Sequence, residues 1–201
     1  MKNVMKHLKK GILMATLMAA SLSFAKEKAS VFMITKDAKM TSIALRDVKK
    51  GNLLFIKDDN GAILYKESIQ KTGLYNKGFD LTSLPDGDYH FVLDKDLEIN
   101  SIPFSVKLGL VEFNKEDEKT SYKPYVRLKG NLLYVTKLAL NKEPLIIDIY
   151  YTGHDIAELM YSKELKGTQT PGEIFKLTGL RKGSYKIVMH SEGRKFVENI
   201  N

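Results

Sequence analysis

Large apolar side chains alternate with polar ones along much of the chain after residue 26. In Tyr89–Leu93 and in Tyr185–Met189 they recur at every second residue, which places them on one face of a β-strand. The intervening His90 and Lys186 are expected to face away from the core. Because no long segment shows the 3.6-residue period of an amphipathic helix, the pattern predicts an all-β protein.

Short apolar runs separated by turn residues predict seven strands in each half of the chain. The clearest turn signal is Asn60-Gly61, a dipeptide that tolerates the positive φ angles of a tight hairpin. Seven short strands per half are typical of an immunoglobulin-like (Ig-like) antiparallel β-sandwich. The predicted strands span residues 30–34, 39–47, 52–57, 62–68, 77–81, 87–94 and 100–107, then 124–128, 131–139, 145–151, 156–163, 173–177, 183–190 and 194–200.

The chain also repeats itself. Ile63–Leu93 aligns without a gap onto Leu159–Met189 at a constant offset of 96, and nine of the 31 pairs are identical. The sequence therefore predicts two tandem copies of one domain. The predicted divisions are a signal peptide at 1–25, an Ig-like sandwich at 26–108, a charged linker at 109–122 and a second Ig-like sandwich at 123–201.

Both copies contain a Leu three residues before a Gly and a Tyr two residues after it. These residue types at this spacing predict a tyrosine corner, in which the Leu fills the core, the Gly lets the chain turn and the Tyr hydroxyl bonds to backbone a few residues upstream. A generic turn that leads into a strand is the alternative. The residues are Leu84, Gly87 and Tyr89 in the first copy and Leu180, Gly183 and Tyr185 in the second.

The succession of strand, Asx-Gly turn, strand and Leu-x-x-Gly-x-Tyr corner resembles a family of secreted Ig-like modules of Bacteroidetes-type bacteria. In particular, it is similar to the C-terminal sorting domains of the type IX secretion pathway. The resemblance implies Ig-like sandwiches in an exported protein, and it implies a secretion-linked accessory or sorting module as an alternative function. The matching residues are Gly61, Leu84, Gly87 and Tyr89, then Leu180, Gly183 and Tyr185.

The first 25 residues predict a cleaved signal peptide. Four lysines precede an uncharged stretch from Gly11 to Ala25, and Ser23 and Ala25 are small residues at the positions that signal peptidase reads. This stretch is shorter than the roughly 20 apolar residues that span a bilayer as a helix, so no stable membrane insertion is expected after cleavage. The protein is predicted to be exported, either to the periplasm or to the cell surface and medium.

Loss of the signal peptide lowers the net charge from +8 to +4, because four of the 32 basic residues and none of the 24 acidic ones lie in it. The remaining charges are of mixed sign rather than gathered in a basic block. No nucleic-acid partner is predicted.

The sequence contains little that points to chemistry. It has no cysteine, which excludes disulfides and thiolate sites, and His90, His154 and His190 stand at no metal-ligand spacing. The acidic turns at 58–60 and 94–98 leave a weak calcium site open, although turns also favour Asp and Asn for their geometry. With no nucleophile or phosphate-binding motif, we predict no enzyme, no catalytic residue, no metal and no cofactor.

Tyrosines are frequent in the second copy, and tyrosine supplies rigid contact area at binding surfaces. Adjacent Tyr150 and Tyr151 must point to opposite faces of a strand, so one is expected in the core and the other at a partner contact. The predicted function is adhesion, scaffolding or partner binding at the cell envelope, with an unknown protein or envelope component as partner. The tyrosines concerned are Tyr122, Tyr125, Tyr134, Tyr150, Tyr151 and Tyr161.

Overall fold

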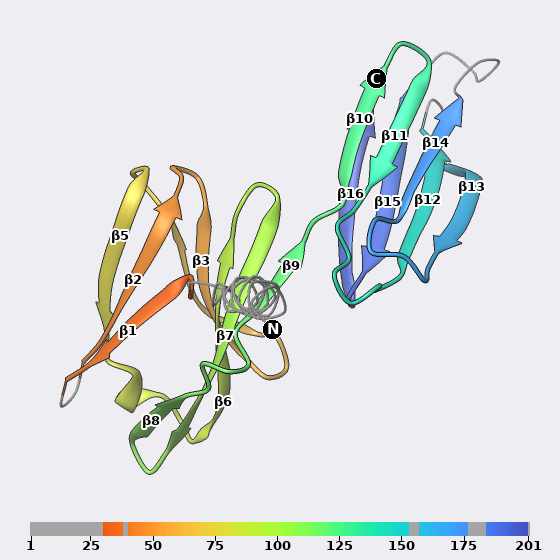
Figure 1. Cartoon of the computed structure of the whole chain (residues 1–201). Coiled ribbons are helices and arrows are strands. Elements are labelled where there is room, and N and C mark those ends of the chain that lie inside the picture. The colour runs from red at the N-terminus through yellow and green to blue at the C-terminus, as the bar shows by residue number, and fades with distance from the viewer. Residues whose placement is uncertain (1–29, 38–39, 153–156, 177–183, 201) are drawn as a thin grey trace, which may run out of the picture. The chain divides into compact units, whose positions relative to one another are not determined.

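The computed structural model describes residues 30–37, 40–152, 157–176 and 184–200. These residues form sixteen strands in four antiparallel sheets, with one 3-10 turn, η1 (Leu81–Ser83), and no α-helix. The predicted all-β class is therefore confirmed (Figure 1). Within the described ranges we find no helix that could span a membrane.

Nine strands form the first two sheets, which we call the N-terminal sheets. The smaller sheet orders β1 (Phe32–Lys36), β2 (Thr41–Val48) and β5 (Gly73–Phe79). The larger sheet orders β4 (Ile63–Ser68), β3 (Leu53–Asp58), β6 (Gly87–Asp94), β7 (Glu98–Lys107) and β8 (Leu110–Phe113), and β9 (Lys119–Tyr122) also pairs with β7.

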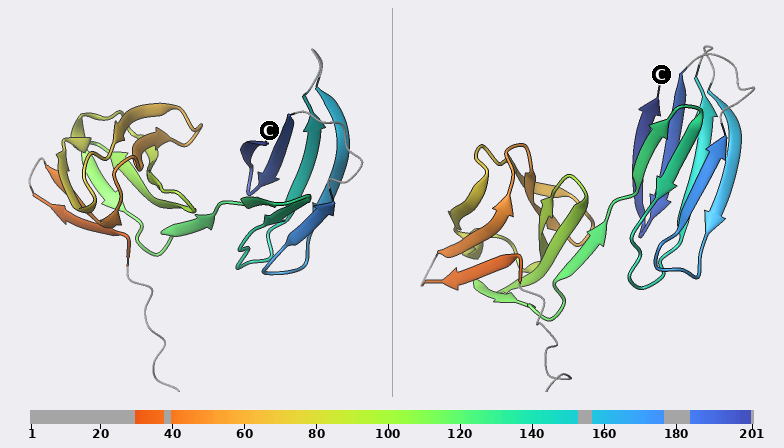
Figure 2. Two further views of the ribbon diagram at one scale, coloured as in Figure 1. Left: turned by 90° about the horizontal axis from the view of Figure 1, so that it is seen from above. Right: turned by 45° about the horizontal axis from the view of Figure 1, so that its top comes forward.

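Seven strands form the other two sheets, which we call the C-terminal sheets. The smaller sheet orders β10 (Tyr125–Lys129), β11 (Leu132–Thr136) and β14 (Gly172–Lys176). The larger sheet orders β13 (Glu158–Leu165), β12 (Leu145–Tyr151), β15 (Tyr185–Ser191) and β16 (Arg194–Ile200). In both views of Figure 2 these two sheets lie as separate layers.

The two halves share one strand order. In each, the first, second and fifth strands form the smaller sheet, and the fourth, third, sixth and seventh strands lie side by side in the larger one. The register agrees as well, since Tyr89 pairs with Phe104 and Tyr185 pairs with Ile200. Phe104 and Ile200 also differ by 96, so the offset continues beyond the segment that aligns in sequence. Each of the fourteen predicted strands overlaps an observed one.

Alternating apolar residues build the core as the sequence pattern predicted. In the C-terminal sheets, Leu133 and Val135 of β11 belong to one buried cluster with residues of β12 and β15, so the two sheets share a core. In the N-terminal sheets, the Phe79 ring of β5 contacts the Phe91 ring of β6 at 5.2 Å between centroids. His90 and Lys186 are half-buried on the opposite side of their strands.

The segment predicted as a charged linker contains two strands. β8 and β9 lie within residues 109–122, and both pair with β7. Their pairing was missed because neither four-residue strand shows enough alternation to stand out in the sequence. The C-terminal counterpart of β7 is β16, and β15 is its only paired strand among the described residues.

The predicted hairpin at Asn60-Gly61 joins β3 to β4. Of the two residues only Gly61 has a positive φ, +83°, so this is not the two-residue turn that Asn-Gly favours. The register shifts by one residue between Ile56 and Lys57. A register shift occurs at the equivalent place in the C-terminal sheets, between Ile149 and Tyr150.

Candidate functional site

The predicted tyrosine corner can be located in the first copy. The hydroxyl of Tyr89 donates a hydrogen bond to the carbonyl of Pro85 at 2.7 Å, and the ring is 5% exposed. Gly87 begins β6 beneath this ring. Leu84 is half-buried, and Leu81, at 2% exposure, is the leucine that fills the core. The corner is a structural feature with no open group for chemistry.

In the second copy the corner falls largely outside the described residues, which leave out Leu180 and Gly183. Tyr185 is 6% exposed, and its ring lies 5.4 Å from that of Tyr151. Tyr151 is buried and Tyr150 is half-buried. Tyr150 is therefore the only one of the two predicted contact residues with surface to offer a partner.

A polar cluster joins the edge strands β4 and β5 of the N-terminal sheets. Glu67 accepts hydrogen bonds from Lys77 at 2.5 Å, from Tyr75 at 3.0 Å and from Tyr65. The bond from Lys77 is the largest cause that lowers the pKa of Glu67, and the same bond raises the pKa of Lys77. Burial, followed by the bond to Glu67, raises the pKa of Tyr75. The cluster satisfies its own charges.

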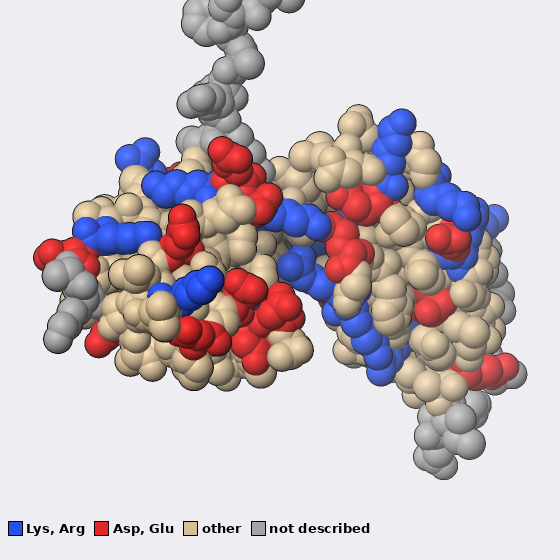
Figure 3. All heavy atoms as spheres, turned by 90° about the horizontal axis from the view of Figure 1, so that it is seen from below, with Lys and Arg blue, Asp and Glu red and all other residues tan. Residues whose placement is uncertain are grey.

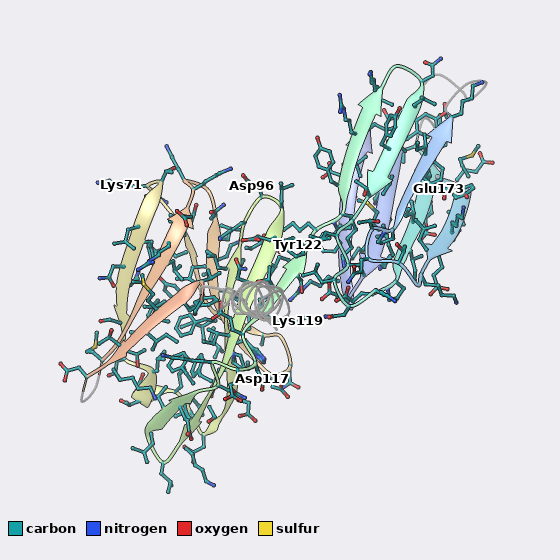
Figure 4. All side chains as sticks on the ribbon, viewed as in Figure 1. Lys71, Asp96, Asp117, Lys119, Tyr122 and Glu173 are labelled. Atoms are coloured by element: carbon teal, nitrogen blue, oxygen red, sulfur yellow. The ribbon has the colours of Figure 1, made fainter. Side chains whose placement is uncertain are left out.

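The same ion pair occurs in the C-terminal sheets with its charges exchanged. Lys163 of β13 lies 2.7 Å from Glu173 of β14 (labelled in Figure 4), and these two positions are Glu67 and Lys77 plus 96. A charged side chain that points inward from an edge strand disfavours pairing with a foreign strand. Both halves therefore protect the same two edges by the same device, so these edges are poor candidates for a binding site.

A buried carboxylate stands in the turn between β15 and β16. Glu192 is 2.9 Å from both Lys137 and Lys119 and accepts a hydrogen bond from Ser121 at 2.8 Å. The Lys137 and Glu192 side chains are 1% and 8% exposed. Burial acts to raise the pKa of Glu192, but these hydrogen bonds outweigh it and lower the pKa to about 2. A carboxylate so fully paired serves stability rather than acid–base chemistry.

A hollow of about 510 Å³ lies over β6, β7 and β8 and is lined by four carboxylates and His90. Figure 3 shows Asp and Glu side chains gathered on the N-terminal sheets. No group of three or more His, Cys, Asp or Glu among the described residues could hold a metal ion. The predicted acidic turn at 94–98 is held by ion pairs to lysines. The carboxylates of the hollow are Asp59, Asp88, Glu112 and Asp117.

The sheet β10–β11–β14 turns its inner face to the core through residues such as Leu133 and Val135, so the alternate residues lie on its outer face. Direct cross-strand pairing arranges these outer residues in three rows of three, which together we call the cationic face. The rows are Tyr125, Thr136 and Gly172; Arg127, Tyr134 and Ile174; and Lys129, Leu132 and Lys176.

The cationic face has a definite composition. Its two edge strands carry Arg127, Lys129 and Lys176, all exposed, and none of the nine positions is acidic. Among the described residues, no ion pair joins any of the three cations to a carboxylate, although eight ion pairs occur elsewhere. Tyr125 is 52% exposed and Ile174 is 59% exposed. The face therefore combines unpaired positive charge with accessible apolar and aromatic surface.

The equivalent face of the N-terminal sheets lacks the cations and the tyrosines, although it exposes Met40. The sheet β1–β2–β5 has the same register, and the positions of Arg127, Tyr134 and Ile174 are occupied there by Thr35, Ser42 and Gly78. The third row begins with Asp37 bonded through its backbone to Met40, where the C-terminal face has Lys129 and Leu132. The first row is Met33, Ala44 and Asn76.

Sequence reasoning noted Tyr125 and Tyr134 but not the cations beside them. Tyr125, Arg127 and Lys129 stand at every second residue, and Val126 between the first two is half-buried. This alternation could have placed them on one outer face. Lys176 joins them only through the pairing of β14 with β11, which the sequence does not reveal.

Comparisons with known proteins identify no family. No family model matches the chain, and no curated protein matches it in sequence. A solved structure described as "Biofilm associated protein - BSP domain" is weakly similar, with 10% identity and a TM-score of 0.26 over 84% of this chain and 28% of that one. This chain therefore spans less than a third of that protein's length.

A second weak similarity is to a structure described as "Structural basis of neurohormone perception by the receptor tyrosine kinase Torso". It has 8% identity and a TM-score of 0.25, over 87% of this chain and 73% of that one. At these TM-scores neither similarity carries an argument about function.

Proposed function

We propose that the chain is an exported, non-enzymatic binding protein of the cell envelope that acts in adhesion or scaffolding through the cationic face. The observation that carries this proposal is the difference between two equivalent sheet faces. One presents three cations, two tyrosines and exposed Ile174, and the other has Asp37 at the position of Lys129 and no cation or aromatic residue at the other positions named. Two copies of one fold need the same core, so a surface that differs this much points to a role beyond folding.

Each half is proposed to be an Ig-like β-sandwich. The strand order of a three-stranded sheet and a larger antiparallel sheet is that expected of such a fold, and it occurs twice. The core shared by the two C-terminal sheets and the Tyr89 hydrogen bond to Pro85 support the same assignment. The resemblance to secreted Ig-like modules of Bacteroidetes-type bacteria remains a prediction.

Export is supported by the predicted signal peptide at residues 1–25, and a binding role by the way in which the ionisable side chains of two clusters pair with one another. Two groups of ionisable side chains are centred on Glu67 and Glu192. In each group, lysine and hydroxyl partners donate hydrogen bonds to the carboxylate. Groups held in this way are not available to exchange protons with a substrate.

Retention of the purified exported protein on envelope fractions of its own organism tests this function. The double variant Tyr125→Ser/Ile174→Ser removes exposed side chains without touching the core, and we expect at least a tenfold loss of retention. Leu108→Ser/Leu110→Ser is the matched control, since it removes two leucines that are 84% and 75% exposed in the N-terminal sheets. Equal retention of all three proteins would rule out the cationic face as the binding surface.

A further inference from the structure

We infer that the partner of the cationic face is an anionic polysaccharide that carries carboxylate groups on both sides of its chain. This inference rests on the proposed binding function and names the chemistry of the ligand.

The positive charges stand on the two edge strands and leave an uncharged stripe between them. Arg127 and Lys129 lie on β10, and Lys176 lies on β14. The stripe is formed by the middle strand β11, through the side chains of Leu132, Tyr134 and Thr136. We call β10 and β14, with their charged side chains, the two cationic rims. Because neighbouring strands are about 4.8 Å apart, the rims are separated by roughly 10 Å.

These cations can bind anions without breaking any ion pair found among the described residues. Lys77, Lys137 and Lys163 are each held by a carboxylate, so they would lose one bond to gain another. Arg127, Lys129 and Lys176 take part in no ion pair among the described residues. An arginine also offers a planar fork that matches a carboxylate with two parallel hydrogen bonds.

The central stripe suits a chain of sugar rings. Tyr134 lies between Arg127 and Ile174 in its row and is half-buried. Its ring therefore offers a shallow apolar surface and does not project fully into solvent. The apolar faces of sugar rings pack on such a surface, as on other aromatic side chains.

The arrangement fits a polyuronate better than a single-stranded nucleic acid. In a linear polyuronate successive sugars are turned over, so their carboxylates alternate between the two sides and meet both rims. A single-stranded nucleic acid has phosphates along one side and bases along the other. Cations on both rims do not match that one-sided distribution of charge.

Polygalacturonate and its fully methyl-esterified form test the inference, because they share a backbone and differ in charge. We expect the exported protein to bind polygalacturonate in titration calorimetry and to bind the methyl ester at least tenfold more weakly. The triple variant Arg127→Gln/Lys129→Gln/Lys176→Gln should lose at least tenfold in affinity. Each single substitution should reduce the salt dependence of log K by roughly one unit at most.

The triple variant Lys50→Gln/Lys71→Gln/Lys107→Gln is the matched control. It removes the same net charge from exposed lysines of the N-terminal sheets and should bind like the wild type. Equal loss in both triple variants would show that net charge and not the cationic face matters, and would overturn the inference.

Two further outcomes separate this inference from the proposed function. Binding to the methyl ester as tight as to polygalacturonate, or tighter binding to oligothymidylate, would overturn the polyuronate inference. If envelope retention still depended on Tyr125 and Ile174 in that case, the binding function would stand with a different ligand. If the protein bound none of the three polymers, and if envelope retention did not depend on Tyr125 and Ile174, both the inference and the proposed function would be overturned.

Discussion

The N-terminal and C-terminal sheets are built to one plan but differ in their surfaces. They share strand order, register and the positions of the edge ion pair, even where the two charges are exchanged. They differ at the outer face of the three-stranded sheet, which carries three cations in the C-terminal sheets and has Asp37 in place of Lys129 in the N-terminal ones. What the halves share explains how they fold, and what they do not share is the basis for the proposed binding face.

The largest expected effect concerns the shared core. Phe91 and Ile187 occupy equivalent positions and are both fully buried. Phe91→Ala and Ile187→Ala should each lower the free energy of unfolding by about 3–4 kcal/mol, because each leaves a cavity in a packed core. Urea unfolding measures both. A cost below about 1 kcal/mol for either variant would show that the two cores are not equivalent.

The turn after the sixth strand of each half contains a carboxylate in a different environment. Glu192 is 8% exposed with three partners, and its equivalent, Asp96, is 64% exposed and has Lys49 as its one ion-pair partner among the described residues. Glu192→Gln should cost about 2–4 kcal/mol because it leaves Lys137 buried without its counter-charge. Asp96→Asn should cost less than about 0.5 kcal/mol. Similar costs would contradict this difference between the halves.

Glu192 also predicts how stability depends on pH. Its folded pKa of about 2 lies below the ordinary value of 4.5, so the folded state prefers the ionised form. The contribution of Glu192 is therefore complete above pH 4.5 and is lost as the pH falls from there towards 2. Urea unfolding over this range should show a smaller loss of stability for Glu192→Gln than for the wild type. Parallel curves would show that Glu192 is not responsible.

The edge ion pair should tolerate exchange but not mismatch. Glu67→Lys places two lysines together and should cost about 1 kcal/mol, since the pair is partly exposed. Glu67→Lys/Lys77→Glu restores opposite charges in the order that β13 and β14 already use, and should recover about half of that loss. The hydroxyls of Tyr65 and Tyr75 keep the recovery incomplete, because they donate to Glu67 in the native cluster. A double variant less stable than the single one would show that charge order matters.

The smallest expected effect on stability concerns the cationic face itself. Tyr125→Ser and Arg127→Gln change exposed side chains, so each should alter the free energy of unfolding by less than about 0.5 kcal/mol. Both should nevertheless weaken retention on envelope fractions. A large loss of stability in thermal melting would mean that these residues support the fold rather than a partner.

The strands and the repeat could be predicted from the sequence because they depend on local alternation. Tyr89 and Phe91 needed only their own neighbours to be placed in a core. β8 and β9 were missed because their place beside β7 depends on pairing. The exchange of charges could be seen in the aligned segment, where Glu67 stands opposite Lys163 in sign. That these residues pair with Lys77 of β5 and Glu173 of β14 could be seen only in the structure.

The cationic face shows the same limit. Tyr125 and Arg127 share a strand, so their common face follows from alternation. Tyr134 and Ile174 join them only when the register of three strands is known, and these strands are separated by up to about 40 residues. A surface assembled from distant segments leaves no local signal in one sequence.

Hydroxyl-radical footprinting of the exported protein, free and bound to its envelope fraction, shows which of the two equivalent faces a partner covers. Oxidisable side chains lie on both equivalent faces: Tyr125 and Tyr134 in the C-terminal sheets, and Met33 and Met40 in the N-terminal sheets. We expect binding to protect the two tyrosines and to leave oxidation of the two methionines unchanged. Protection of Met33 and Met40 with none at Tyr125 and Tyr134 would contradict this expectation.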